Sequence, residues 1–315
     1  MNVLFTGASS FSGYWMVEAL SRGGHRVVAP LRGKADGYAD VKGRRVKALP
    51  EICQLHFGLS FGDGGFLDLI EKQGPFDILC HHAAEVRDYR SPDFDAVRAL
   101  AGNVSGLVPV LRKLREQGCR KMILTGSVFE PNEGIGQSPR RAFSPYGLSK
   151  GLTSQYVQYF AWREEFSLGK FVIPNPFGPL EEPRFLSYLI KTWLAGQTAA
   201  VKTPRYVRDN IHVDLLALAY RQMVEALADS PGYARFGPSG YVESMGEFSH
   251  RVATEISKRI GRPCPLRLET QTDFSEPMAR VNADRVDASA LDWSESAAWD
   301  KLADYYLGNT GRFLS

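Results

Sequence analysis

The chain has 315 residues, of which 44% are hydrophobic and 23% charged, a composition typical of a globular protein. Its formal net charge of +3 and the lack of a long Lys/Arg block argue against nucleic-acid binding. No apolar run approaches the roughly 18 residues of a membrane span, and the N-terminus lacks the layout of a signal peptide, so we expect a cytoplasmic protein without a membrane partner. The four cysteines form no CxxC pair, and we expect free thiols rather than zinc ligands or disulfides.

A glycine-containing loop lies between a strand and a helix at the start of the chain. Residues 2–5 are typical of a short apolar strand, 6–13 of a tight loop, 14–22 of a helix and 25–31 of a second strand. The N–H groups of a helix N-terminus attract a pyrophosphate, and glycines let the backbone approach it closely. In this context the loop predicts a dinucleotide site.

The alternation of strands and helices continues to residue 173. We expect strands at 76–82, 121–126 and 170–173, one long helix over 93–117, and another helix from Tyr146 to about Phe166. This pattern predicts an α/β fold with a doubly wound, mainly parallel sheet, that is, a Rossmann fold.

Beyond residue 173 the regular alternation stops. The expected helices and the one short strand are, in chain order, 185–195, 214–226, 246–260, 265–269 (the strand) and 294–307. We therefore divide the chain into a nucleotide-binding domain (1–173), completed by a returning segment near 209–228, and a smaller C-terminal α/β subdomain (mainly 174–315) for the substrate.

Two further patterns bear on chemistry. Tyr146 and Lys150 are four residues apart and so share a helix face, where an ammonium can lower the pKa of a phenol and make it a usable acid/base. The same spacing also occurs in ordinary surface pairs, so its meaning depends on the rest of the chain. His81 and His82 are neighbours in an expected strand and point to opposite faces, so we predict no metal site there but a floor beneath the cofactor.

Several motifs occur in the order found in one enzyme family. They are Thr6-Gly7-Ala8 with Phe11 and Gly13, His82-Ala83-Ala84, Asn103, Ser127, Tyr146-x-x-x-Lys150, Asn175-Pro176-Phe177-Gly178-Pro179 and Arg208-Asp209-Asn210-Ile211-His212-Val213. Together they resemble the extended short-chain dehydrogenases/reductases, in the NAD(P)-dependent nucleotide-sugar epimerase/dehydratase group. The resemblance implies cofactor contacts from Gly7, Ser9, Ser10, Phe11, Gly13, His82, Ala83, Ala84, Asn103, Tyr146 and Lys150.

The chain departs from the family pattern around the cofactor. The middle glycine of the loop is Ser10 here, and we expect its Cβ to crowd the pyrophosphate unless the turn shifts. Relatives that use NAD carry an acidic residue after the second strand, whereas Arg32 and Lys34 stand here and suit the 2′-phosphate of NADP. We expect NADP, with NAD and a solvated basic turn as open alternatives. The acidic residue of the third strand is absent from residues 57–60, and Asp63 is its candidate replacement.

The resemblance also implies three catalytic roles. Tyr146 moves a proton, and Ser127 hydrogen-bonds the reacting oxygen, with Thr125 as the alternative. Lys150 holds the nicotinamide ribose and keeps the Tyr146 pKa low.

The segment after Ser127 bears on the reaction type. Dehydratase relatives carry an Asp-Glu pair directly after the catalytic hydroxyl, but Val128 and Phe129 stand here, which argues against a dehydratase. Glu130 is expected either as a contact to the sugar or as a plain loop residue. A family arginine of the C-terminal part is not clearly matched, and Arg280 is its nearest candidate.

Three residues of the second half match substrate-binding positions. Asn175 and Arg208 correspond to contacts with the diphosphate, for which an arginine fork is well suited, and Arg184 opens a helix expected over the nucleotide. The alternative for Arg208 is a structural ion pair with Asp209 or Asp214.

The resemblance implies an NAD(P)-dependent enzyme acting at a carbon of a nucleoside-diphosphate sugar. We expect NADP(H)-linked reduction of a 4-keto sugar. A 4-epimerase with tightly bound NAD, like UDP-glucose 4-epimerase, is the alternative, and a non-enzymatic NADP-sensing regulator is a third possibility. The resemblance also implies a homodimer, formed through the helices expected at 93–117 and 146–166.

Overall fold

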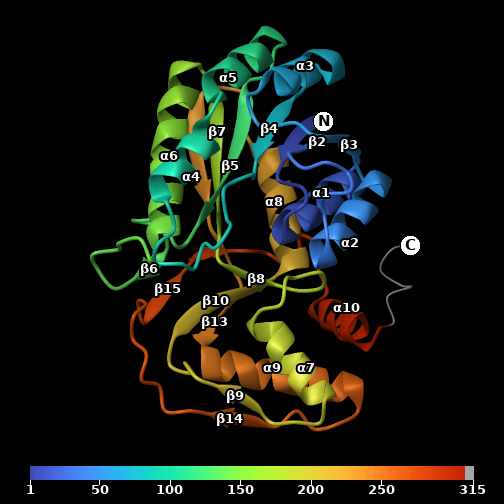
Figure 1. Cartoon of the computed structure of the whole chain (residues 1–315), viewed down its shortest axis with the longest axis vertical. Coiled ribbons are helices and arrows are strands. Elements are labelled where there is room, and N and C mark those ends of the chain that lie inside the picture. Colours follow the sequence, from blue (N-terminus) through green and yellow to red (C-terminus); the bar gives the residue numbers. More distant parts are fainter. Residues whose placement is uncertain (309–315) are drawn as a thin grey trace.

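A seven-stranded parallel sheet forms the larger lobe of the computed structural model, which describes residues 1–308 (Figure 1). In spatial order its strands are β11 (Gly232–Phe236), β7 (Ser167–Ile173), β5 (Lys121–Ser127), β4 (Ile78–His81), β1 (Asn2–Thr6), β2 (Arg26–Leu31) and β3 (Gln54–Phe57). The central strands are buried on both sides, as expected for a sheet covered by helices. The order reverses between β1 and β4, the place where ligands bind in open α/β sheets.

Helices cover both faces of the sheet (Figure 1). On one side lie α1 (Phe11–Arg22), α2 (Asp40–Ala48), the short 3₁₀ helix at Leu49–Glu51 and α8 (Val213–Ala226), and on the other α3 (Gly64–Gln73), α4 (Ala96–Val104), α5 (Leu107–Glu116) and α6 (Pro145–Arg163). The two faces have separate apolar cores, one built around α1 and α8 and the other around α3, α5 and α6. The Rossmann-type fold predicted from the sequence is confirmed.

A smaller lobe lies beneath the carboxyl edge of the sheet (Figure 1). Its helices are α7 (Phe185–Leu194), α9 (Met245–Ile260) and α10 (Glu295–Leu307), and its strands are β6 (Ile135–Gly136), β8 (Asn175–Phe177), β9 (Ala199–Val201), β10 (Val207–His212), β12 (Pro238–Ser239), β13 (Tyr241–Ser244), β14 (Leu266–Leu268), β15 (Ala279–Val281) and β16 (Asp284–Arg285). A third apolar core, with Trp193 and Trp299, holds this lobe together. None of the helices within residues 1–308 combines the length and apolar character needed to cross a membrane.

Two predictions about the elements were wrong. The helix expected over 93–117 is broken into α4 and α5, because Gly106 adopts a φ of +72° and its Cα packs against Gly62 too closely for a side chain. A seventh strand, β11, was not foreseen. It is exposed along most of its length and carries no clear alternation of apolar residues.

Candidate active site

The loop between β1 and α1 has the shape of a phosphate cradle. Gly7 has a φ of +85°, and a Cβ there would lie 2.8 Å from the backbone nitrogen of Ala83. A Cβ on Gly13 would lie 2.3 Å from the carbonyl oxygen of Gly7. The two glycines keep this close-packed loop free of side chains. Within residues 1–308 the N–H groups of Phe11 and Ser12, at the start of α1, have no hydrogen-bond partner, so they are left for a ligand. The residues present fit a dinucleotide.

Ser10 stands where the family pattern has its middle glycine. Its hydroxyl caps α1 by accepting from the N–H of Gly13 (3.1 Å) and donates to the carbonyl of Gly7 (2.9 Å). Because its proton is used there, Ser10 must accept the hydrogen bond from Nε2 of His82, 3.0 Å away. The serine hydroxyl is thus directed at the carbonyl of Gly7 and at His82, which follows β4.

His82 joins the glycine loop to β5. Its Nε2 lies 3.2 Å from the hydroxyl of Ser12, and its Nδ1 lies 3.0 Å from the hydroxyl of Thr125. Burial, followed by the charges of Lys150 and His81, lowers the His82 pKa to about 3. The ring is neutral, with Nε2 as donor and Nδ1 as acceptor. It fits the prediction of a floor at the cofactor site.

Asn103 and His81 hold the backbone around His82 in place through hydrogen bonds. Nδ1 of His81 lies 3.1 Å from the Thr6 hydroxyl, which also accepts from the N–H of Ala83. The Asn103 side chain accepts from the N–H of Glu85 (2.8 Å) and donates to Thr153 (3.2 Å). Through these two hydrogen bonds Asn103 holds the segment after β4 in place, and the cofactor contact expected of it stays a prediction.

The adenosine side of the cradle is basic. Arg32 is 70% exposed, with a loose ion pair to Glu85 at 3.7 Å, and Lys34 is exposed beside it. Lys42 adds a third basic group, and its pKa is lowered, first by burial and then by the positive charges of Arg45 and Arg32. Asp63, in contrast, caps α3 by accepting from the N–H groups of Phe66 and Ser60, so it does not face this side as a replacement carboxylate.

Tyr146 lies in the first turn of α6, which begins after the N-cap Ser144. Its ring is packed edge-on against Tyr89 (5.4 Å between centroids) and Phe94 (5.9 Å). Burial raises the Tyr146 pKa above its usual value, and the charge of Glu130 adds to this, while Arg184 opposes it.

Lys150 does not produce the predicted lowering of the Tyr146 pKa. Its ammonium donates to the carbonyl oxygen of Thr125 on β5, at 2.6 Å. Burial lowers the Lys150 pKa, with Glu130 working against this and Lys170 in favour. The pair shares a helix face as expected, but the structure directs the ammonium at the sheet, and the electrostatic setting of Tyr146 comes from Glu130 and Arg184.

Ser127 ends β5, and its hydroxyl is half-buried. Within residues 1–308 the only hydrogen bond of this hydroxyl is the one that it accepts from the N–H of Phe129, at 3.2 Å. Thr125 is 4% exposed, and its hydroxyl bonds His82. Of the two candidates, Ser127 is therefore the one with a hydroxyl free to face a ligand.

Glu130 is not placed to contact a sugar. It is 1% exposed, its carboxylate accepts from the backbone N–H of Ser127 (2.8 Å), and it pairs with Lys170 at 2.7 Å. Lys170 also pairs with Glu133 at 2.7 Å, which in turn pairs with Arg235 at 2.9 Å. The predicted substrate contact is replaced by a buried row of charges directly behind Ser127.

On the opposite side of Tyr146 the site is open and cationic. The guanidinium groups of Arg184 and Arg90 each lie 5.5 Å from the centre of the Tyr89 ring. Arg184 is the N-cap of α7, as the predicted helix start required. Asn175 lies on β8, half-exposed, and its side chain makes no hydrogen bond within residues 1–308. Tyr89 and Arg90 were missed, because an irregular segment without a motif carries no sequence signal.

Arg208 and Arg280 are less available than predicted. Arg208 pairs with Glu276 at 2.6 Å, not with Asp209 or Asp214. Arg280 is 1% exposed, and its guanidinium donates to backbone carbonyls of the segment 130–141. In this structure it clamps the loop after β5.

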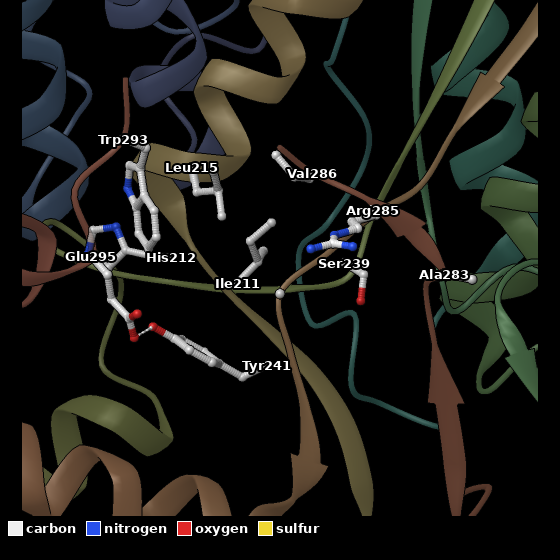
Figure 2. A pocket seen from close by; sticks show the side chains of 11 residues that line it. Ile211, His212, Leu215, Ser239, Tyr241, Ala283, Arg285, Val286, Trp293 and Glu295 are labelled. Carbon is white, nitrogen blue, oxygen red and sulfur yellow. Dashed lines mark hydrogen bonds between the residues drawn. The ribbon is translucent and has the colours of Figure 1, made fainter. Parts of the chain in front are cut away.

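A separate cavity of about 340 Å³ lies behind β10, next to the C-terminal segment (Figure 2). The side chains around it include Ile211, Leu215 and Val286, and on its wall the Tyr241 hydroxyl donates to the Glu295 carboxylate (Figure 2). None of the predicted site residues lines it, so the candidate active site is the surface around Tyr146 and the glycine loop.

The family can be assigned once this geometry is compared with known proteins. The family model described as "NAD dependent epimerase/dehydratase family" matches residues 3–236. The chain belongs to this family. The membership confirms the resemblance seen in the sequence and places the chain among enzymes of the short-chain dehydrogenase/reductase type.

Solved structures agree in fold along the whole chain. UDP-glucuronic acid 4-epimerase from Bacillus cereus, bound to a fluorinated substrate analogue and NAD, shares 18% identity at a TM-score of 0.75, covering 98% of this chain and 100% of its own. UDP-glucose 4-epimerase from Thermotoga maritima with UDP-glucose shares 19% identity at a TM-score of 0.70, covering 98% of this chain and 99% of its own. The dTDP-glucose 4,6-dehydratase DesIV from Streptomyces venezuelae shares 18% identity at a TM-score of 0.72, covering 100% of both chains. At these identities the likeness is one of fold. A search of curated proteins gave no match.

Proposed function

We propose that this family member is an NADP(H)-linked oxidoreductase that reduces a keto group at C4 of a nucleoside-diphosphate sugar. The observation that carries the proposal is the arrangement around Tyr146. Tyr146 lies in the first turn of α6, and one turn later the Lys150 ammonium donates to the carbonyl oxygen of Thr125 on β5, the strand that ends in Ser127. The glycine loop that follows β1 keeps its closest approaches free of side chains. The carboxyl edge of the sheet is where hydride chemistry is performed in open α/β sheets.

Each residue of the site has a defined task in this reaction. The nicotinamide supplies the hydride when it is bound. Tyr146 gives its phenolic proton to the oxygen at the reacting carbon, and the half-buried Ser127 hydroxyl hydrogen-bonds the same oxygen. A pKa raised by burial keeps Tyr146 protonated, which is the form that an acid requires.

The basic adenosine side supports NADP. Arg32, Lys34 and Lys42 lie after β2, and the strand ends in Leu31 instead of an acidic residue. A 2′-phosphate would gain charge-assisted hydrogen bonds there, whereas the ribose of NAD would lack its usual carboxylate partner.

A 4-epimerase is the second candidate, because two of the three solved structures described above are named as 4-epimerases. In that reaction the same side chains would first remove the hydride and then return it to the other face. Mass spectrometry of small molecules released from the denatured protein distinguishes the two. Bound NAD⁺ together with interconversion of UDP-glucose and UDP-galactose would overturn the reductase proposal.

Tyr146→Phe tests the catalytic assignment itself. Loss of the proton donor should lower kcat by about 10²- to 10⁴-fold at an unchanged fold. Tyr233→Phe is the control, because Tyr233 lies exposed on β11, outside the site and outside the helices α4 and α6, and it should retain full turnover. If Tyr146→Phe turned over every accepted nucleotide sugar at the wild-type rate, the proposal would be refuted.

We also propose a homodimer formed through α4 and α6. Leu148, Leu152, Tyr156, Tyr159 and Trp162 recur at helical spacing along α6, and all are exposed, Trp162 by 73%. Val97 on α4 is 76% exposed. An apolar face of this kind is typical of an interface between copies. Light scattering should give a mass of twice the 35.0 kDa of one chain, and Trp162→Glu should reduce the measured mass to that of a single chain.

A further inference from the structure

The guanidinium of Arg208 is held by its own chain on every side but one. Nη1 donates to the carbonyls of Val207 (2.9 Å) and Pro277 (3.0 Å), and the ring of Tyr206 stacks on its face at 4.5 Å. Nη2 donates to the carboxylate of Glu276 at 2.6 Å. The carbonyls and the ring fix the position of the guanidinium. Glu276 is the only charged group that it binds within residues 1–308.

The two partners of this ion pair differ sharply in burial. The Arg208 side chain is 8% exposed, whereas the Glu276 side chain is 52% exposed. Glu276 lies in the segment 269–278, which has no helix or strand, and its backbone N–H is tied to the Tyr206 hydroxyl at 3.1 Å. The carboxylate can therefore swing into water without disturbing the core, while the guanidinium stays in place. An exposed partner of this kind contributes little to stability.

The surroundings add a second cation to this place. The guanidinium of Arg280, whose Nε is buried without a hydrogen-bond partner within residues 1–308, lies 4.9 Å from the centre of the Phe143 ring. The Arg208 guanidinium lies 5.8 Å from the centre of the same ring, so both cations contact one aromatic side chain.

We propose that Glu276 is an internal competitor for the anion-binding edge of Arg208. It occupies the guanidinium in the free protein, and the diphosphate of the substrate must displace it to bind. This proposal rests on the proposed function, because it takes Arg208 as the diphosphate contact. It makes Glu276 a residue that sets affinity and selectivity: a dianionic diphosphate can replace a single carboxylate, whereas a neutral or weakly charged sugar cannot.

Calorimetric titration with UDP, dTDP and GDP tests the proposal on the full-length protein. Glu276→Gln keeps the size and a hydrogen-bond acceptor but removes the competing charge, so the tightest of the three should bind about three- to tenfold tighter than to the wild type. Glu269→Gln is the matched control, because Glu269 is an acidic residue of the same segment paired with Arg267 at 3.1 Å, and it should leave the affinity unchanged. In Glu276→Asp the shorter side chain loosens the contact with Arg208, so its affinity should lie between those of the wild type and Glu276→Gln. This variant takes the place of Glu276→Gln if the latter does not fold.

The outcomes separate this proposal from the proposed function. If Arg208→Gln weakens nucleotide binding but Glu276→Gln does not strengthen it, Glu276 is a structural clip, and only the competitor proposal fails. The same conclusion holds if Glu276→Gln lowers Tm at unchanged affinity. If none of the three diphosphates binds the wild type or Glu276→Gln, no diphosphate site exists, and the nucleotide-sugar substrate of the proposed function falls as well.

Discussion

The cofactor side and the substrate side of this site are built in opposite ways. Around the glycine loop the polar side chains bond one another in a closed network, in which Ser10, His82 and Thr125 leave a backbone cradle open between them. On the substrate side the cationic groups are open to solvent or held by a surface carboxylate, as Arg184 and Arg208 are. The first side is ready to receive its ligand as it stands, whereas the second has to change partners when a ligand binds.

The difference follows from the chemistry of the two ligands. A pyrophosphate is bound by backbone N–H groups, whose positions are set once the strand, loop and helix have formed. The proposed sugar nucleotide would be bound by long side chains, which can pair with nearby carboxylates when the ligand is absent. The comparison predicts that changes on the cofactor side act through shape and changes on the substrate side act through charge.

The largest effect is expected from Gly13→Ala. Its Cβ would lie 2.3 Å from the backbone oxygen of Gly7, so the loop must shift, at a cost of about 1–3 kcal/mol and with loss of most of the affinity for the dinucleotide. Gly102→Ala on α4 is the control, since nothing lies within 4 Å of the added Cβ. Fluorescence titration with NADPH and thermal unfolding measure the two effects. Unchanged cofactor affinity in Gly13→Ala would mean that the cradle is not the phosphate site.

An intermediate effect is expected from Arg32→Ser. Loss of a charge-assisted hydrogen bond to the 2′-phosphate should reduce the preference for NADP over NAD by about ten- to a hundredfold. Arg22→Ser is a matched control, because the Arg22 side chain is also 70% exposed but pairs with Glu18 on α1. The ratio of kcat/KM for the two cofactors measures the preference. Equal ratios in the wild type and in Arg32→Ser would contradict the NADP assignment.

The same contrast explains how far the sequence could be read. The glycine loop and the start of α6 were predictable because each depends on local rules of chain geometry, and their motifs follow in a fixed order. The partners of Glu130 and Arg208 were not, because Lys170 and Glu276 lie 40 and 68 residues away and meet them only in the folded chain. The break at Gly106 likewise depends on a contact with the distant Gly62.

The smallest effect on turnover is expected from Glu130→Gln, which removes a negative charge near Tyr146 and keeps an oxygen that can accept from the N–H of Ser127. After burial, the negative charge of Glu130 is the main cause that raises the Tyr146 pKa, and it also raises the Lys150 pKa. Removing it should lower both. A reduction that needs protonated Tyr146 slows as the pH rises through this pKa, so in Glu130→Gln the decline of kcat should begin at lower pH. Turnover below that limb should stay close to wild type.

Glu133→Gln makes this prediction specific to position. Both carboxylates bond Lys170 at 2.7 Å, so each variant removes one charge from the same ammonium and leaves it one partner. Glu133 is not among the groups that shift the Tyr146 pKa. The pH profile should therefore move in Glu130→Gln and remain in place in Glu133→Gln. Equal profiles in the two variants would show that the buried row of charges is structural, and that the electrostatic control of Tyr146 lies entirely on its open side, with Arg184.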